Sequence, residues 1–207
     1  MNITAIFVEL LIIGLGVLCW LVLFVAYILG LNLDSSFFQI NPILIAPLTA
    51  VTYILGIVAD RLIRDPFVYL VEKPAQKKVH KEYAEKIDKI KKLSTAINKP
   101  LAAMELEKYV RANSQDLGQK IDYNRNRLRI CRSWILHFLL ITIAFYAWNN
   151  KVKVLDSSQQ NWIVITGIIL FSVTLYTAIK LSIDHQRDII ESSEIILANK
   201  KATIKDS

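Results

Sequence analysis

The sequence predicts an all-α integral membrane protein with four transmembrane helices and a cytoplasmic helical hairpin between the second and third of them. Three observations predict this: four long apolar stretches, a basic segment in mid-chain, and helical periodicity of the apolar residues in that segment. With 54% hydrophobic residues among 207, the chain is too apolar for an ordinary soluble domain. With 21% charged residues, it is too polar to be embedded in a membrane throughout.

Four stretches are long and apolar enough to cross a bilayer, which takes about 20 residues at about 1.5 Å each. The first has no Lys or Arg ahead of its apolar run, and that run is longer than the core of a signal peptide. We therefore expect it to stay in the protein as an anchor. The stretches are Ile3–Gly30, Ile43–Ala59, Trp134–Trp148 extended back toward Cys131, and Trp162–Leu181.

The distribution of basic residues predicts the orientation. From Arg61 to Arg132 the chain holds 18 Lys and Arg against 9 Asp and Glu, a net charge of +9. The loops that follow the first and third stretches hold only Lys151 and Lys153. By the positive-inside rule, the basic segment and both termini face the cytoplasm. The abundance of Ile, Lys and Asn is typical of a bacterium with an AT-rich genome. The expected location is therefore the bacterial plasma membrane, which the chain crosses several times.

The expected organisation has four parts. Residues 1–64 form a first transmembrane hairpin and 131–183 a second, with a basic helical hairpin at 65–130 between them and an amphipathic cytoplasmic tail at 184–207. Within the basic hairpin, Pro74 opens a first helix and the "NKP" at 98–100 ends it. Three apolar stripes at helical spacing favour packing of the hairpin on itself and on the tail, with coiled-coil self-association as the alternative. They are Val79, Tyr83, Ile87, Ile90, Leu93 and Ile97; Ala103, Leu106, Val110, Leu117, Ile121 and Leu128; and Ile183, Ile190 and Leu197.

The tetrapeptide "LDSS" occurs twice, at Leu33–Ser36 and Leu155–Ser158, each time just before a stretch that returns to the cytoplasm. In each copy a serine precedes a glutamine by three residues, which is the spacing of a capping box at a helix start. We therefore interpret both copies as helix-restart signals on the outer side. A duplicated hairpin and an acidic outer vestibule are the alternatives.

Polar residues at membrane depth are the candidate pore-lining residues. Ionisable groups inside a span are costly, so Glu9 in the first stretch is a functional candidate. In the second stretch, small and polar residues recur at spacings of three and four and end in a carboxylate: Thr49, Thr52, Gly56 and Asp60. They predict an ion path, with carboxylates selecting ions. The structural alternative is helix packing, with Glu9 or Asp60 paired to Arg61 or Arg132.

A second candidate site lies in "RNRLRICR", where Arg125, Arg129 and Arg132 share one side of a helix at the membrane surface. Arginine forks fit phosphate, so these residues predict contact with anionic lipid headgroups, or a phosphate-bearing ligand. The lysine-rich stretch before them has one aromatic residue, Tyr83, and is interpreted as a solvated face, so direct nucleic-acid binding is not expected.

The sequence contains no phosphate-cradling glycine loop, HExxH, CxxC or nucleophile elbow. No enzyme activity, catalytic residue, cofactor or metal is predicted, and the two cysteines suit neither a disulfide framework nor a metal site. The predicted function is a small oligomeric membrane channel or pore-forming effector, gated through the basic hairpin by a cytoplasmic protein or nucleotide. The alternative is a non-conducting anchor or scaffold whose cytoplasmic helices dock a partner protein. The third interpretation is an enzyme or lipid-binding protein that uses the charged residues at the inner leaflet.

Overall fold

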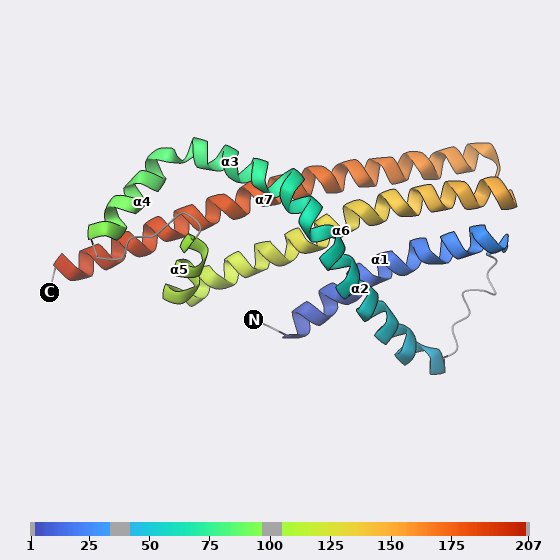
Figure 1. Ribbon diagram of the computed structural model, residues 1–207, viewed down its shortest axis with the longest axis horizontal. Helices are drawn as coiled ribbons and strands as arrows, with labels where there is room; N and C mark the ends of the chain where they lie inside the picture. Colours follow the sequence, from blue (N-terminus) through green and yellow to red (C-terminus); the bar gives the residue numbers. More distant parts are fainter. Residues whose placement is uncertain (1–2, 34–41, 97–104, 206–207) are drawn as a thin grey trace. The chain divides into compact units, whose positions relative to one another are not determined.

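The computed structural model describes residues 3–33, 42–96 and 105–205, and their regular structure is entirely helical (Figure 1). The chain divides into two compact units. The first comprises Asn2–Phe67 and Arg129–Ala178, and we call it the apolar unit. The second comprises Val68–Leu128 and Ile179–Ser207, and we call it the charged unit. The first "LDSS" capping box, at Ser36 and Gln39, and the "NKP" break lie outside the described residues.

Two helices of the apolar unit, α1 (Ile3–Leu29) and α2 (Ile45–Phe67), pack closely through glycine. A short 3₁₀ turn, η2 (Pro42–Leu44), precedes α2. A Cβ on Gly14 would overlap the carbonyl oxygen of Thr52, and one on Gly56 would overlap that of Leu10. Because no side chain separates the two backbones at these points, the helices approach as small residues allow in membrane proteins. The apolar residues buried around this contact are Ile13, Val17, Ala59 and Ile63.

The apolar unit also contains parts of the long helices α6 (Gln115–Val152) and α7 (Ser157–Lys205). A tight turn joins them, and Lys153 in it has a φ of 57°, which is uncommon for a residue with a side chain. Asn149 holds the turn: its Oδ1 accepts from the Leu155 N–H at 2.9 Å, and its Nδ2 donates to the Gln160 Oε1 at 3.0 Å. Along the two helices, a Cβ on Gly167 would overlap the Thr142 hydroxyl, so α6 and α7 are close there too.

The second "LDSS" copy does start a helix, as predicted, but the capping box is one residue earlier than the predicted Ser157–Gln160 pair. The Asp156 Oδ1 accepts from the Gln159 N–H at 2.8 Å, and the Gln159 Oε1 accepts from the Asp156 N–H at 3.4 Å. Gln160 is engaged elsewhere, because its side chain bonds Asn149 and Asn150 of α6. Because the Gln160 side chain is held by α6, the neighbouring Gln159 completes the cap.

This shift gives a testable prediction. Asp156→Ala removes the acceptor for the Gln159 N–H and should lower the free energy of unfolding by about 1 kcal/mol, the usual value for a lost N-cap. Ser157→Ala is the matched control and should leave stability unchanged, because Ser157 is the first residue of α7 and not its cap. Thermal unfolding of the detergent-solubilised protein measures both. A larger loss for Ser157→Ala than for Asp156→Ala would restore the cap predicted from sequence.

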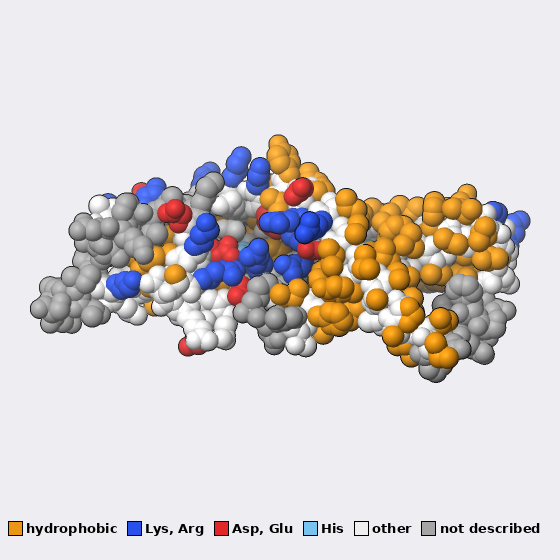
Figure 2. Space-filling view, turned by 60° about the horizontal axis from the view of Figure 1, so that its bottom comes forward, with side chains coloured by type: hydrophobic (Ala, Val, Ile, Leu, Met, Phe, Trp, Pro, Cys, Tyr) orange, Lys and Arg blue, Asp and Glu red, His pale blue; other side chains and the backbone are white. Residues whose placement is uncertain are grey.

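Four helices are long and apolar enough to cross a membrane, in agreement with the four predicted stretches. They are α1, α2 with its continuation to Glu82, α6 and α7. In the apolar unit these helices carry large hydrophobic side chains on the outside, and Figure 2 shows this surface. Leu15, Ile54 and Ile168 are each more than half exposed. Exposed apolar surface of this kind marks a site of contact with a membrane or with another protein.

The charged unit is a separate bundle with its own core. It contains a π-helical turn η3 (Val68–Glu72), α3 (Lys73–Glu82), α4 (Ala84–Ala96) and α5 (Leu106–Asn113), together with parts of α6 and α7. All three predicted apolar stripes contribute to one buried cluster, so the tail packs on the segment between the spans, as predicted. The buried members are Val79, Ile87, Ile90, Leu106, Tyr109, Val110, Ile121, Ile189, Ile190, Ile196 and Leu197.

The helices of the charged unit break where the sequence did not predict it. The expected helix through Leu106 and Leu128 is interrupted at Ser114, whose backbone is extended with a φ of −149° and a ψ of 117°. The Ser114 hydroxyl accepts from the Leu117 N–H at 3.4 Å and so caps the start of α6. Gly118, the weaker helix former, lies inside α6. A second break at Tyr83 separates α3 from α4.

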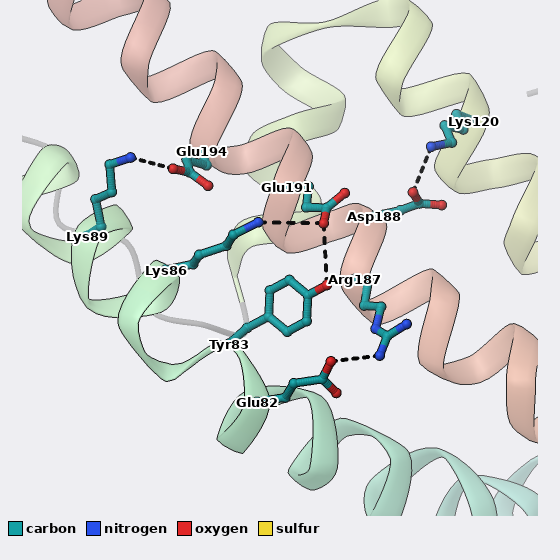
Figure 3. A network of polar contacts seen from close by, with 9 residues as sticks. All are labelled: Glu82, Tyr83, Lys86, Lys89, Lys120, Arg187, Asp188, Glu191 and Glu194. Atoms are coloured by element: carbon teal, nitrogen blue, oxygen red, sulfur yellow. Dashed lines mark hydrogen bonds and ion pairs between the residues drawn. The ribbon is translucent and has the colours of Figure 1, made fainter.

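A row of acidic side chains on α7 joins the helices of the charged unit (Figure 3). Lys120 donates to Asp188 at 2.7 Å, and Lys89 donates to Glu194 at 2.6 Å. Between them Glu191 accepts from the Tyr83 hydroxyl at 3.4 Å. These lysines are well exposed, and exposed pairs are worth about 0–1 kcal/mol each. Burial of the apolar cluster therefore dominates stability, and the ion pairs fix the register of the helices.

Candidate functional site

Four ionisable side chains of the apolar unit form a buried group, which we call the charge cluster: Glu9, Asp60, Arg129 and Arg132. Arg132 Nη2 lies 2.5 Å from Asp60 Oδ1. Arg129 Nε lies 3.7 Å from Asp60 Oδ2, and Arg129 Nη1 lies 3.3 Å from Glu9 Oε2. The side chain of Glu9 is 7% exposed and that of Arg132 is 9% exposed. The cluster is thus formally neutral and nearly removed from solvent.

Local helical geometry positions each member. Arg129 and Arg132 are three residues apart on α6, so both guanidinium groups project from one side of that helix. Asp60 lies one helical turn after Gly56, where α2 touches α1. Glu9 lies next to Leu10, whose carbonyl oxygen is the atom that Gly56 meets. The glycine contact between α1 and α2 therefore brings the two carboxylates to the same side of α6.

The energetics of the cluster are asymmetric. Moving a charge out of water costs several kcal/mol even after relaxation, and pairing offsets that cost only when the geometry is good. Asp60 receives both arginines, whereas Glu9 receives Arg129 alone. The Asp60–Arg132 pair is therefore the tighter part of the cluster, and the Glu9–Arg129 pair is the looser one.

Most of the residues predicted to line a pore lie inside the apolar unit, while Thr49 is half-buried. Glu9, Thr52 and Gly56 are buried, and Asp60 pairs with the two arginines. The Thr52 hydroxyl donates to the Leu48 carbonyl at 2.7 Å, and the Thr49 hydroxyl donates to the Ile45 carbonyl at 2.7 Å. Both hydroxyls thus bond their own helix. A pore lining formed by several copies stays a prediction.

The predicted phosphate-binding arginines do not form one group. Arg129 and Arg132 belong to the charge cluster, where each contacts a carboxylate of the chain itself. Arg125 belongs to the charged unit, and its Nη1 lies 3.7 Å from Glu107 Oε1. Phosphate binding by these arginines stays a prediction, and Arg125, with a side chain 49% exposed, is the most accessible of them.

Sequence reasoning considered Asp60 with Arg132, and the structure contains that pair. It did not assign Arg129 to Glu9, which is 120 residues away in the chain. The sequence did contain a signal for this pairing. Two carboxylates lie in or next to the predicted spans, and two arginines three residues apart on a third helix equal them in number and are opposite in charge. Arg61 was the other candidate partner, but it is exposed at the surface of α2.

Two further contacts fix α6 against α1. On one side of the unit, the ring of His137 is buried against Gly16, where a Cβ would overlap it. Near the end of α1, Lys151 Nζ donates to the carbonyl oxygens of Tyr27 and Ile28 at 2.8 and 3.0 Å. A cation at the C-terminal end of a helix is favourable, because the last carbonyl groups there carry partial negative charge. These contacts fix the position of α6 relative to α1, and with it the position of Arg129 relative to Glu9.

No protein-family model, curated protein or solved structure matches this chain. The fold and site alone therefore define the class of protein. It is an all-helical protein with four helices able to span a membrane, a neutral charge cluster buried among three of them, and a charged bundle with its own core.

Proposed function

We propose that the chain is a multi-pass membrane protein whose apolar unit crosses the bilayer and whose charged unit and termini lie in the cytoplasm. The exposed hydrophobic surface of the apolar unit supports insertion. The net charge of +9 between Arg61 and Arg132 supports the orientation, because cytoplasmic segments retain Lys and Arg.

We further propose that it is a small oligomeric ion channel, and the charge cluster is the observation that carries this. Ionisable residues at membrane depth are rare and usually belong to ion or proton paths. A simple anchor needs none, yet here Glu9 lies inside a predicted span and belongs to a group of four ionisable side chains that are only 7% to 17% exposed. Four helices from one chain enclose too little space for an aqueous path, so several copies surround the path.

In this proposal the observed cluster is the closed state. Separation of Arg129 from Glu9 frees a carboxylate to face the path, and a ring of carboxylates selects cations. Glu9 has Arg129 alone as an ion-pair partner among the described residues, whereas Asp60 has two arginines, so the Glu9–Arg129 pair is the first to open. Because α6 carries Arg129 and also contributes to the charged unit, a ligand or partner bound there can shift the equilibrium.

Potassium flux from proteoliposomes containing the full chain tests the proposal. Arg129→Gln should raise the flux, because each loss of about 1.4 kcal/mol from the closed state raises the open fraction about tenfold. Glu9→Gln should lower cation-over-anion selectivity. Arg127→Gln, an exposed arginine on the same helix, is the matched control and should behave as wild type. Tight vesicles for every variant, with folded and inserted protein, would rule out conduction.

A second function, a scaffold that docks a partner protein, is favoured by one observation. The charged unit has a hydrophobic core of its own, so it is a folded domain rather than a connecting loop. A scaffold predicts protein capture that depends on exposed side chains of this unit and is unaffected by Arg129→Gln. Capture together with tight vesicles would favour the scaffold over the channel.

A further inference from the structure

An exposed strip follows directly after α2. The helix continues from Ile45 to Glu82, through η3 and into α3. Tyr69 and Leu70 on η3 are 69% and 71% exposed, although both are large and apolar. The exposed residues that follow on α3 before Glu82 are four lysines, with Pro74 between the first and second of them. We call the set the η3–α3 strip: Tyr69, Leu70, Lys73, Lys77, Lys78 and Lys81.

The strip is the side of the helix that the charged unit leaves uncovered. Ala75 and Val79, on the other side of α3, are buried, and Val79 belongs to the apolar cluster. Lys73 lies 4.8 Å from the centre of the Tyr69 ring, so a cation and an aromatic side chain already adjoin.

The lysines of the strip differ from those on α4. Lys86 and Lys89 pair with Glu191 and Glu194 of α7. By contrast, no described residue forms an ion pair with the four lysines of the strip. Their charge is therefore open to an external partner.

The chemistry and position of the strip identify that partner. The predicted apolar stretch of α2 ends at Ala59, and Tyr69 and Leu70 follow it by ten and eleven residues. If α2 crosses the bilayer, residues this close after a span lie near the membrane surface, where tyrosine is enriched and lysine extends its amine toward phosphate. We propose that the η3–α3 strip lies on the cytoplasmic face of the membrane and binds anionic lipid, with Tyr69 and Leu70 among the headgroups.

This inference rests on membrane insertion, as proposed above, but not on conduction. It also moves the expected lipid contact away from the arginines of α6. The guanidinium groups of Arg125, Arg129 and Arg132 contact carboxylates of the chain, whereas the lysines of the strip have no ion-pair partner among the described residues.

Spin-label accessibility in the full chain tests it. Leu70→Cys, Ile195→Cys and Ile169→Cys are made singly after Cys19→Ala and Cys131→Ala, and are reconstituted in nanodiscs of phosphatidylcholine with or without phosphatidylglycerol. Ile195 is the matched control, because it is also an exposed apolar residue of the charged unit, at 53%. Ile169, in α7 of the apolar unit and 55% exposed, reports insertion.

The label at 70 should be reached by oxygen more than by a water-soluble nickel complex, and more so with phosphatidylglycerol. The label at 195 should show the reverse. Lys73→Gln with Lys77→Gln should reduce the effect of phosphatidylglycerol, whereas Lys92→Gln with Lys108→Gln, an equal change of charge, should not. Raising salt from about 0.1 to about 1 M shortens the screening length from about 10 to about 3 Å and should act like the first pair.

Three results would overturn the inference. One is equal access of the nickel complex to positions 70 and 195 in both lipids, while position 169 still reports lipid. That result would leave insertion standing. Another is indifference of position 70 to lipid charge. The third is spin–spin broadening at position 70, which would show that a second copy covers the strip.

Discussion

Arg132→Ala is expected to lower the free energy of unfolding by about 3–5 kcal/mol, the usual cost of removing one partner from a buried ion pair. Asp60 would keep only the longer contact with Arg129, at 3.7 Å. The Asp60 side chain is only 17% exposed, so water compensates little of its charge once Arg132 is removed. The free energy lost with the ion pair is therefore larger than any gained when neighbouring side chains rearrange. Thermal unfolding in detergent, followed by the loss of the monodisperse peak, measures the change.

Two controls separate pairing from simple truncation. Arg127→Ala lies on the same helix but is exposed, and should change stability by less than about 1 kcal/mol. Asp60→Ala combined with Arg132→Ala should be less destabilising than the sum of the two single changes. Each single change leaves one charge of the pair without its partner, whereas the double change removes both charges. Additive losses would show that the two residues act independently and that the cluster is not a unit.

Gly56→Leu is the second change with a large expected effect. The new Cβ would overlap the backbone carbonyl of Leu10, and rotation of a side chain cannot relieve a clash with backbone. The helices would have to separate, at a cost above about 3 kcal/mol, beyond the usual range for overpacking. Since the same contact places Glu9 near Asp60, we expect the variant to lose the charge cluster as well. Its yield of folded, monodisperse protein is the measurement.

Gly118→Ala is the matched control for a glycine inside a helix. A Cβ there meets its nearest atom, the Cα of Arg111, at 3.4 Å, so little must move. Replacing a helical glycine with alanine should stabilise α6 by up to about 1 kcal/mol. A Gly56→Leu variant as stable as wild type would mean that α1 and α2 are not held at this distance.

Local patterns predicted the elements well. Four long apolar stretches predicted four helices able to cross a membrane, and the structure has a helix of sufficient length and apolar composition at each of them. The heptad spacing of Ile183, Ile190 and Leu197 correctly placed the tail on the segment between the spans, because a stripe on one helix requires another stripe to cover it.

Breaks and caps were less predictable. Ser114 ends α5 and caps α6, but a serine inside an amphipathic pattern also suits a helix interior, and the nearby Gly118 is the weaker helix former of the two. At the start of α7, two glutamines competed for one cap. The choice of Gln159 depended on Asn149, a residue of the preceding helix that holds Gln160.

Apolar runs and their periodicity were enough to predict the helical class, the four stretches able to cross a membrane, and the charged residues near them. The pairing of those charges could not be predicted in this way. Periodicity is local, so it places Arg129 on a face of α6 but does not say that Glu9 comes within 3.3 Å of it. That contact depends on two glycines letting α1 and α2 touch, and on the face they turn toward α6. The same holds for the η3–α3 strip, whose exposure reflects which side of α3 the core had already covered.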